Sequence, residues 1–223
     1  MKSFAEERRF FPDPQMTLAD GLIMVGGELS LENLLEAYSF GIFPWPQPGL
    51  PTLWFSPEQR GILDFKDLHW SRSFLKFKRS TNWRITVNED FPAVIRQCAQ
   101  IPRPGQEGTW ITPDIEKSYI DFHRAGYAHS IECRSEGELI GGLYGVYVGN
   151  VFAGESMFYR RDNASKLCLW WLIEQLKGRG HTWMDAPMVS ESLRPLGGQY
   201  MPRKQFLQRL AAAHKQPFQP FKI

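Results

Sequence analysis

The longest hydrophobic pattern in the chain is a set of three apolar segments between residues 128 and 158, which predicts three successive strands. They cover Ala128–Cys133, Leu139–Val148 and Val151–Phe158, and the glycine and asparagine at positions 149 and 150 predict a tight hairpin between the last two. A helix is expected from about residue 164 to 176, followed by a strand at His181–Ala186. A meander followed by a strand–helix–strand crossover is typical of an α+β fold with a mixed sheet.

Helical periodicity predicts further helices on both sides of this region. Ser30 is expected to cap one that ends at Gly41 and buries Leu31, Leu34, Leu35 and Tyr38. Thr112 is expected to cap another, with Pro113 in its first position and Gly126 at its end. A short helix from residue 91 to 98 and a C-terminal helix after residue 202 complete the set.

The first 62 residues are expected to form a small α/β domain of their own, ahead of the larger sheet-forming region. An apolar strand closed by glycines at residues 21–27 precedes the capped helix, and prolines on both sides of Trp45 place that indole in a rigid loop. Trp45 is either a hydrophobic plug between two layers or a stacking surface for a ligand. We expect domains at residues 1–62 and 63–223, with the larger one ordered like the acyl-CoA N-acyltransferase fold.

Charge is distributed unevenly, although the net charge is only +2. Residues 68–88 contain no Asp or Glu but carry five cations, which are Arg72, Lys76, Lys78, Arg79 and Arg84. Three of them recur at helical spacing on one face. Such a run is often a solvated face, but a single sign over about twenty residues also favours a phosphate backbone as the partner.

Composition and cysteine usage limit the class of protein. The three cysteines are widely spaced and form no CxxC or Cys/His cluster, so neither a disulfide framework nor a zinc site is predicted. The chain shows no apolar signal region near residue 1 and no run of 18 apolar residues. We therefore expect a cytoplasmic protein that is neither secreted nor membrane-spanning.

The strand Val151–Phe158 carries an unusual pair, Gly154 and Glu155, in its middle. A central glycine weakens a strand unless something must approach the backbone, and a carboxylate among apolar residues is costly to bury unless it is paired or used. Two interpretations follow. Either this is a bulge with Glu155 in solvent, or a functional site is built on the strand.

The sequence gives little support to two common kinds of catalysis, attack by an activated serine and acyl transfer from CoA. Ser156 follows Gly-Glu rather than lying in a GxSxG motif, and the histidines show no informative spacing. Residues 175–180 match the QxxGxG string of acetyltransferases, which binds the CoA pyrophosphate at a helix N-terminus. Here the string lies at the end of a predicted helix, where glycines terminate helices. We therefore do not expect CoA binding, although a CoA-dependent N-acetyltransferase remains an alternative.

An ordered series of motifs resembles the bacterial leucyl/phenylalanyl-tRNA–protein transferases. The resemblance runs from about residue 11 to 210, nearly the whole chain. Its motifs are GL…GGELS (21–30), GIFPW (41–45), SP (56–57), GTWIT (108–112), HSIE (129–132), GGLYGV (141–146), GESMF (154–158) and NASK (163–166).

The resemblance implies transfer of Leu, Phe or Met from aminoacyl-tRNA to the α-amine of proteins that begin with Arg or Lys. Such a transfer marks the acceptor for degradation through the N-degron pathway. No metal, CoA or other cofactor is implied. The partners are aminoacyl-tRNA and the acceptor protein, and we expect a monomer.

The resemblance also implies roles for individual residues. Glu155 and Asp185 take the catalytic positions. The 3′-terminal adenosine and aminoacyl end are assigned to four aromatic residues, Trp45, Trp110, Tyr38 and Tyr119. An unbranched apolar side chain is assigned to a pocket made of Leu143, Phe152, Gly154, Met157, Leu169 and Leu172. The five cations of residues 72–84 are assigned to the tRNA backbone.

One departure concerns the late strand. The family pattern Asp-Cys-Gln, whose Gln is assigned a part in activating the amine, reads Asp185-Ala186-Pro187 here. Proline offers no side-chain donor or acceptor. Three alternatives stay open: the Gln is dispensable, acceptor specificity has shifted, or this chain is an inactive tRNA-binding homologue.

Overall fold

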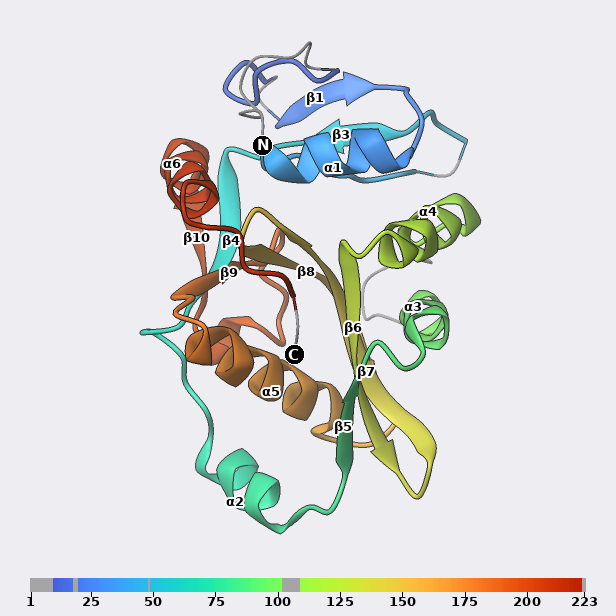
Figure 1. Ribbon diagram of the computed structural model, residues 1–223, viewed down its shortest axis with the longest axis vertical. Helices are drawn as coiled ribbons and strands as arrows, with labels where there is room; N and C mark the ends of the chain where they lie inside the picture. The colour runs from blue at the N-terminus through green and yellow to red at the C-terminus, as the bar shows by residue number, and fades with distance from the viewer. Residues whose placement is uncertain (1–9, 18–19, 48, 102–108, 222–223) are drawn as a thin grey trace.

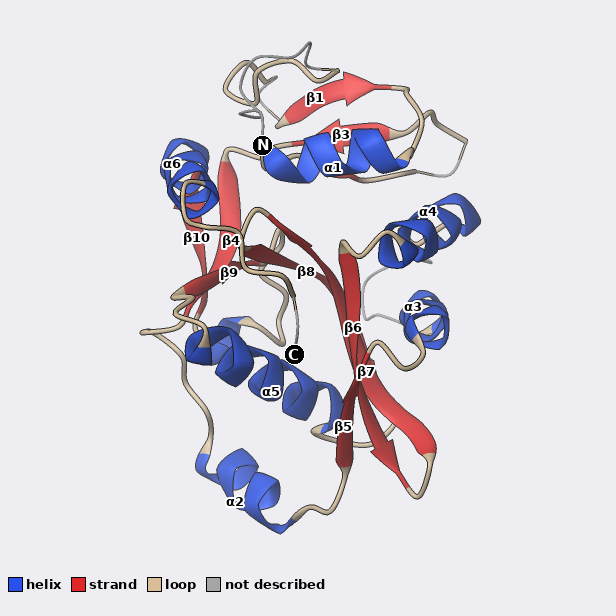
Figure 2. Ribbon diagram, in the orientation of Figure 1, coloured by secondary structure: helices blue, strands red, loops and turns tan. Residues whose placement is uncertain are grey.

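Two β-sheets and six helices make up the part of the chain that the structure describes, residues 10–17, 20–47, 49–101 and 109–221 of a computed structural model. Figure 1 shows the smaller sheet, with α1 beside it, at one end of the long axis and α2 at the other. The larger sheet lies between them, with helices on both of its faces (Figure 2).

The larger sheet has seven strands in the order β10-β4-β9-β8-β7-β6-β5. Every neighbouring pair is antiparallel except β8 and β9, which are parallel. Its strands are β4 (Gln59–Asp64), β5 (Arg84–Val87), β6 (Ala128–Ser135), β7 (Glu138–Val148), β8 (Val151–Tyr159), β9 (Trp183–Asp185) and β10 (Gly198–Pro202). The predicted meander and crossover are present, and the α+β class is confirmed.

Helices cover the two faces of this sheet with different partners. The face toward α1 (Leu31–Ser39), α3 (Phe91–Gln100) and α4 (Pro113–Arg124) buries one cluster of side chains. The opposite face buries a second cluster against α5 (Ala164–Gly178) and α2 (Arg72–Ser80). The C-terminal helix α6 (Arg203–His214) packs over β4 and β9, and a short 3-10 helix spans Arg194–Leu196.

Local sequence explains where the helices begin. The side chains of Ser30, Ser71, Asp90 and Thr112 each accept a hydrogen bond from a backbone N–H in the first turn of their helix. The predicted caps at Ser30 and Thr112 are therefore confirmed. Helix α1 ends at Ser39, just before Gly41, which adopts a positive φ of 71°.

The smaller sheet has the order β1-β3-β2, with β1 at Leu22–Val25, β2 at Phe43–Pro44 and β3 at Leu53–Phe55. This sheet and α1 share a hydrophobic cluster with α3, α4 and the larger sheet. The smaller sheet ends at Phe55 and the larger one begins at Gln59. A division into two domains at residue 62 stays a prediction, and so does the structure of residues 1–9, which lie outside the described part.

Two strands at one end of the larger sheet, the edge strand and its neighbour, were not predicted from the sequence. Strands β4 and β10 pair with each other and extend the sheet beyond β9. Neither reads as an alternating apolar strand, because β4 contains Arg60 and Gly61 and β10 is largely polar. The predicted strand at 181–186 is shorter than expected, Trp183–Asp185, and Leu31 is 39% exposed rather than inward-facing.

Candidate functional site

Glu155 lies at a β-bulge in strand β8. The ladder with β7 pairs Tyr144 with Ser156 and Gly145 with Gly154, so Glu155 is the extra residue between them. The bulge of the first interpretation is therefore present, but Glu155 is half-buried and hydrogen-bonded rather than turned fully into solvent. Glu155 Oε1 accepts a 2.7 Å hydrogen bond from the hydroxyl of Tyr38.

Two tyrosines on different helices meet at this carboxylate. Tyr38 lies in α1 and Tyr119 in α4, both are buried, and their hydroxyl groups hydrogen-bond to each other. Their rings meet edge to face with centroids 6.5 Å apart. The bulge and two helices thus fix one connected chain of hydroxyl and carboxyl groups across the face of the sheet.

The surroundings of Glu155 bring its pKa into the neutral range. Burial is the largest cause and raises the pKa, the hydrogen bond from Tyr38 lowers it, the charge of Asp185 raises it and that of Arg60 lowers it, and the resulting pKa is about 7. Burial, followed by the Glu155 charge, raises the pKa of both tyrosines well above the ordinary value. The tyrosines therefore act as donors, while the carboxyl group can gain or lose a proton near pH 7.

Asp185 is held beside this group by a residue that sequence reasoning missed. Nε and Nη2 of Arg60 donate to the two carboxylate oxygens of Asp185 at 2.8 and 2.6 Å, and both residues are buried. The Arg60 guanidinium also lies between the rings of Phe43 and Phe206, 4.6 and 4.8 Å from their centroids. Arg60 belongs to the missed strand β4, so only the sheet order could have revealed it.

The two predicted stacking tryptophans are brought together. The rings of Trp45 and Trp110 are stacked, with centroids 5.6 Å apart and an interplanar angle of 13°. Trp110 in turn meets Tyr119 edge to face at 6.4 Å. The aromatic pair is thus continuous with the Tyr119–Tyr38–Glu155 chain. Gly108 of the same motif lies outside the described residues.

The residues assigned to the aminoacyl pocket lie on the opposite face of the sheet, where they form part of a packed hydrophobic cluster. One hydrophobic cluster beneath α5 contains Leu143, Phe152, Met157, Leu169 and Leu172. All but Met157 are buried. The structure therefore divides the predicted site between the two faces, with Glu155 and the aromatic residues on one and the apolar pocket residues on the other.

Strands β8 and β9 share a single ladder pair, Ala153 with Asp185, immediately before Gly154 and Glu155. Beyond this pair no ladder hydrogen bonds join the described residues of the two strands, which leaves a gap in the sheet beside the two groups of predicted site residues. A Cβ on Gly154 would lie 3.0 Å from the methyl group of Met184, so a larger residue would crowd this gap. A cavity of about 10 Å³, room for about one water molecule, lies nearby and is lined in part by Tyr38, Ala153 and Asp185.

The structure also places the QxxGxG string and Pro187. The QxxGxG string occupies the C-terminal end of α5, as predicted, and Gly180 there has a positive φ of 83°. Pro187 is buried just beyond the end of β9.

Across the described residues, no group of three His, Cys, Asp or Glu side chains is arranged to hold a metal ion.

The basic residues predicted to contact tRNA are in different environments. Arg72, Lys76 and Arg79 are exposed on α2, and no salt bridge joins them to a described residue. Lys78 instead lies over the ring of Trp170, 3.9 Å from its centroid.

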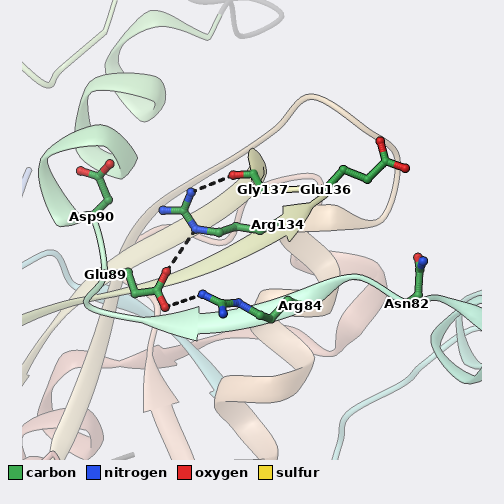
Figure 3. Close-up of a pocket in the computed structure, with 7 residues that line it drawn as sticks. All are labelled: Asn82, Arg84, Glu89, Asp90, Arg134, Glu136 and Gly137. Atoms are coloured by element: carbon green, nitrogen blue, oxygen red, sulfur yellow. Dashed lines mark hydrogen bonds and ion pairs between the residues drawn. The ribbon is translucent and has the colours of Figure 1, made fainter.

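Arg84 lies elsewhere, in a polar surface pocket of about 680 Å³ beside β5 and β6. There it forms a 2.6 Å ion pair with Glu89, which also faces Arg134 (Figure 3). The positive charge of Arg84 is therefore already partly offset by a carboxylate.

Comparisons with known proteins match both parts of the chain. A family model described as leucyl/phenylalanyl-tRNA protein transferase matches residues 62–211, and the model of that family's N-terminal domain matches residues 27–58. Curated proteins named leucyl/phenylalanyl-tRNA–protein transferase are also similar. The one from Pseudoalteromonas atlantica is 48% identical over 93% of this chain and 89% of its own. That from Pseudomonas entomophila is 46% identical over 93% and 92%.

Solved structures are more distant. L-PGS from Bacillus licheniformis aligns with a TM-score of 0.42 and 13% identity, covering 83% of this chain and 71% of that one. A GCN5-related N-acetyltransferase-like protein from Streptococcus suis aligns with a TM-score of 0.36 and 14% identity, covering 76% and 63%. Within the described part of the chain, no helix combines the length and apolarity needed to cross a membrane.

Proposed function

Because the chain belongs to the leucyl/phenylalanyl-tRNA–protein transferase family, and is therefore a tRNA-dependent aminoacyltransferase, we propose that it transfers Leu, Phe or Met to proteins beginning with Arg or Lys. The product carries a new N-terminal residue and is marked for degradation through the N-degron pathway. We also propose that the enzyme works in the cytoplasm as a monomer.

The observation that carries the proposal is the position of the Glu155 carboxyl group. It lies at the bulge of β8, is hydrogen-bonded to Tyr38, and has a pKa raised by burial to about 7. A group with that pKa can accept a proton from an α-ammonium group near neutral pH and leave the amine free to react. The carboxylate would also orient the amine toward the ester of the aminoacyl-tRNA.

The reaction needs little more than alignment and one proton acceptor, because the ester of aminoacyl-tRNA is already activated. The free amine attacks the ester carbonyl carbon, and the C–N bond forms as the bond to the ribose oxygen breaks. The α-ammonium group loses two protons in all. Glu155 takes the first and releases it to solvent, and the second, lost from the nitrogen as the C–N bond forms, ends on the leaving ribose oxygen. Tyr38 and Tyr119 keep the carboxylate oriented through their linked hydroxyl groups.

Asp185 has a supporting part in this proposal. Its two oxygens are occupied by Arg60, so it is poorly placed to take a proton itself. Instead, the Arg60–Asp185 ion pair joins β4 to β9 and places one positive and one negative charge next to Glu155. Pro187, just beyond β9, contributes no side-chain hydrogen bond, which supports a route through Glu155 rather than through residue 187.

The donor would span the gap beside Gly154. Its terminal adenosine stacks on the Trp45–Trp110 pair, and its side chain reaches the cluster of Leu143, Phe152, Met157, Leu169 and Leu172. Those residues suit an unbranched apolar chain, whereas β-branched Val and Ile would clash. The exposed cations of α2 contact the tRNA backbone at the far end of the molecule (Figure 1).

A second candidate follows from Pro187, since the family's Gln is absent. The chain would then bind aminoacyl-tRNA without transferring the amino acid, or it would use other acceptors. Incubation with labelled leucyl-tRNA and peptides beginning with Arg, Lys, Asp or Glu separates these cases. We expect product with Arg and Lys. Product only with Asp or Glu would show an acceptor shift, and binding without product would show an inactive homologue.

A further inference from the structure

The C-terminal segment after α6 packs back into the body of the protein. From residue 215 the chain leaves α6 and runs toward the face of the sheet that α5 covers, ending beside β6, β7 and β8 (Figure 1). The last described residue, Phe221, joins the hydrophobic cluster that contains the proposed donor pocket.

The hairpin between β7 and β8 fixes the path of this segment. Asn150 has a positive φ of 65° and is buried, and Oδ1 of its side chain accepts a 2.9 Å hydrogen bond from the backbone N–H of Gln219. Its Nδ2 group donates to three backbone oxygens, those of Ala213, Gln216 and Pro217. Nη1 of Arg179, at the end of α5, donates to the Pro220 carbonyl at 3.1 Å.

These contacts place one aromatic ring against three strands. The Phe221 ring stacks on His129 with centroids 4.1 Å apart, and lies 5.2 Å from Tyr147 and 5.5 Å from Phe152. Burial lowers the pKa of His129 to about 4, so that imidazole is neutral near pH 7 and forms part of an apolar wall. Phe218, three residues earlier, is 56% exposed.

We propose that Phe221 closes the inner end of the donor side-chain pocket and limits the size of the amino acid that the pocket accepts. The inference rests on the proposed function, because Phe152 belongs to the donor pocket only within it. The Phe221 ring packs against Phe152, so a donor side chain packed on Phe152 cannot extend into the space that this ring fills. Shortening Phe221, or releasing the segment that carries it, opens this space.

Two variants test the proposal by different routes. Phe221→Ala removes the ring, and Asn150→Gly removes the hydrogen bonds to the segment while glycine still accommodates the positive φ. Phe218→Ala is the matched control from the same segment. The measurement is the ratio of kcat/KM for tRNA charged with tryptophan to that for tRNA charged with leucine. Melting temperatures confirm that each variant is folded.

We expect both variants to raise the tryptophan-to-leucine ratio about tenfold, the scale of discrimination that an apolar pocket wall provides, while Phe218→Ala leaves it unchanged. A ratio that stays within about twofold of the wild-type value in folded Phe221→Ala protein would overturn the proposal. So would equal losses with both donors, because these would show that the segment only stabilises the fold.

Failure of the proposed function is separable from failure of this inference. If the wild-type protein transfers no leucine, the proposed function is wrong. The pocket is then tested by calorimetry with two amide-linked adenosines, one carrying phenylalanine and one carrying naphthylalanine. Tighter relative binding of the naphthylalanyl compound by Phe221→Ala supports the wall at Phe221. An unchanged preference, or no binding of either compound to any variant, overturns it.

Discussion

Tyr38 donates a 2.7 Å hydrogen bond to Glu155, joining helix α1 of the N-terminal region to the bulge of β8. These residues are 117 positions apart in the sequence. The contact holds the Glu155 carboxyl group close to the single ladder pair between β8 and β9. It also makes the smaller sheet and its helix part of the site rather than an accessory to it.

Glu155→Gln keeps the size of the side chain but removes its capacity to accept a proton. We expect kcat to fall by about 10²–10⁴-fold, the usual contribution of a positioned base, with little change in the Kd for aminoacyl-tRNA. Single-turnover rates and filter binding measure the two quantities. Glu138→Gln, an exposed carboxylate on β7, is the control. Equal losses of rate and affinity would argue against a chemical role for Glu155.

The pH dependence of the reaction is expected to follow the Glu155 carboxyl group. Because the deprotonated form accepts the proton, activity should rise with pH through about 7, the raised pKa of this residue. The Tyr38 hydrogen bond lowers that pKa, so Tyr38→Phe should move the rising limb to higher pH. Asp185 and Arg60 remain in place in this variant. If the rising limb of the profile stays at the same pH in Tyr38→Phe, Tyr38 does not influence the group whose titration controls the activity.

Stability should also depend on the charge of Glu155. Burial raises its pKa in the folded protein above the ordinary value of 4.5, so its protonated form favours folding, and this contribution is lost as pH rises from about 4.5 through 7. Glu155→Gln has no such loss. We expect the variant to melt at a higher temperature than wild type at pH 8 and at nearly the same temperature at pH 5. A variant that melts lower at pH 8 would contradict this sign.

The exposed cations of α2 are expected to contact tRNA phosphates. Replacing Arg72, Lys76 and Arg79 by Ala should weaken tRNA binding and make the plot of log K against log salt shallower by about 2–3. A control triple replacement of Lys66, Lys117 and Lys204, which are also exposed, removes the same charge elsewhere. Identical slopes in the two triple variants would show that α2 acts only through net charge.

The sequence predicted the local parts of this structure well, because their signals are local. The caps at Ser30 and Thr112 and the hairpin at residues 149 and 150 depend on neighbouring residues alone. Arg60 could not be found in this way. Its partner, Asp185, is 125 positions away, and its strand, Gln59–Asp64, has only two apolar residues to signal the pairing with β9 and β10.

The direction in which Glu155 points also depends on long-range packing. The pattern of β8 allowed a bulge facing solvent, and only the placement of α1 and α4 puts Tyr38 and Tyr119 against the carboxyl group. The role of the C-terminal segment was hidden for the same reason. Nothing near Phe221 in the sequence indicates that Asn150 holds its segment or that Phe152 lies beside its ring.

The most direct test of the account is the mass of an Arg-initiated peptide after incubation with leucyl-tRNA and the wild-type protein. The account predicts a peptide heavier by one leucine residue, attached at the α-amine, and far less of it when Glu155→Gln replaces the wild type. Absence of the heavier peptide with Arg and with every other N-terminal residue tried, from a folded protein that binds the tRNA, would contradict it.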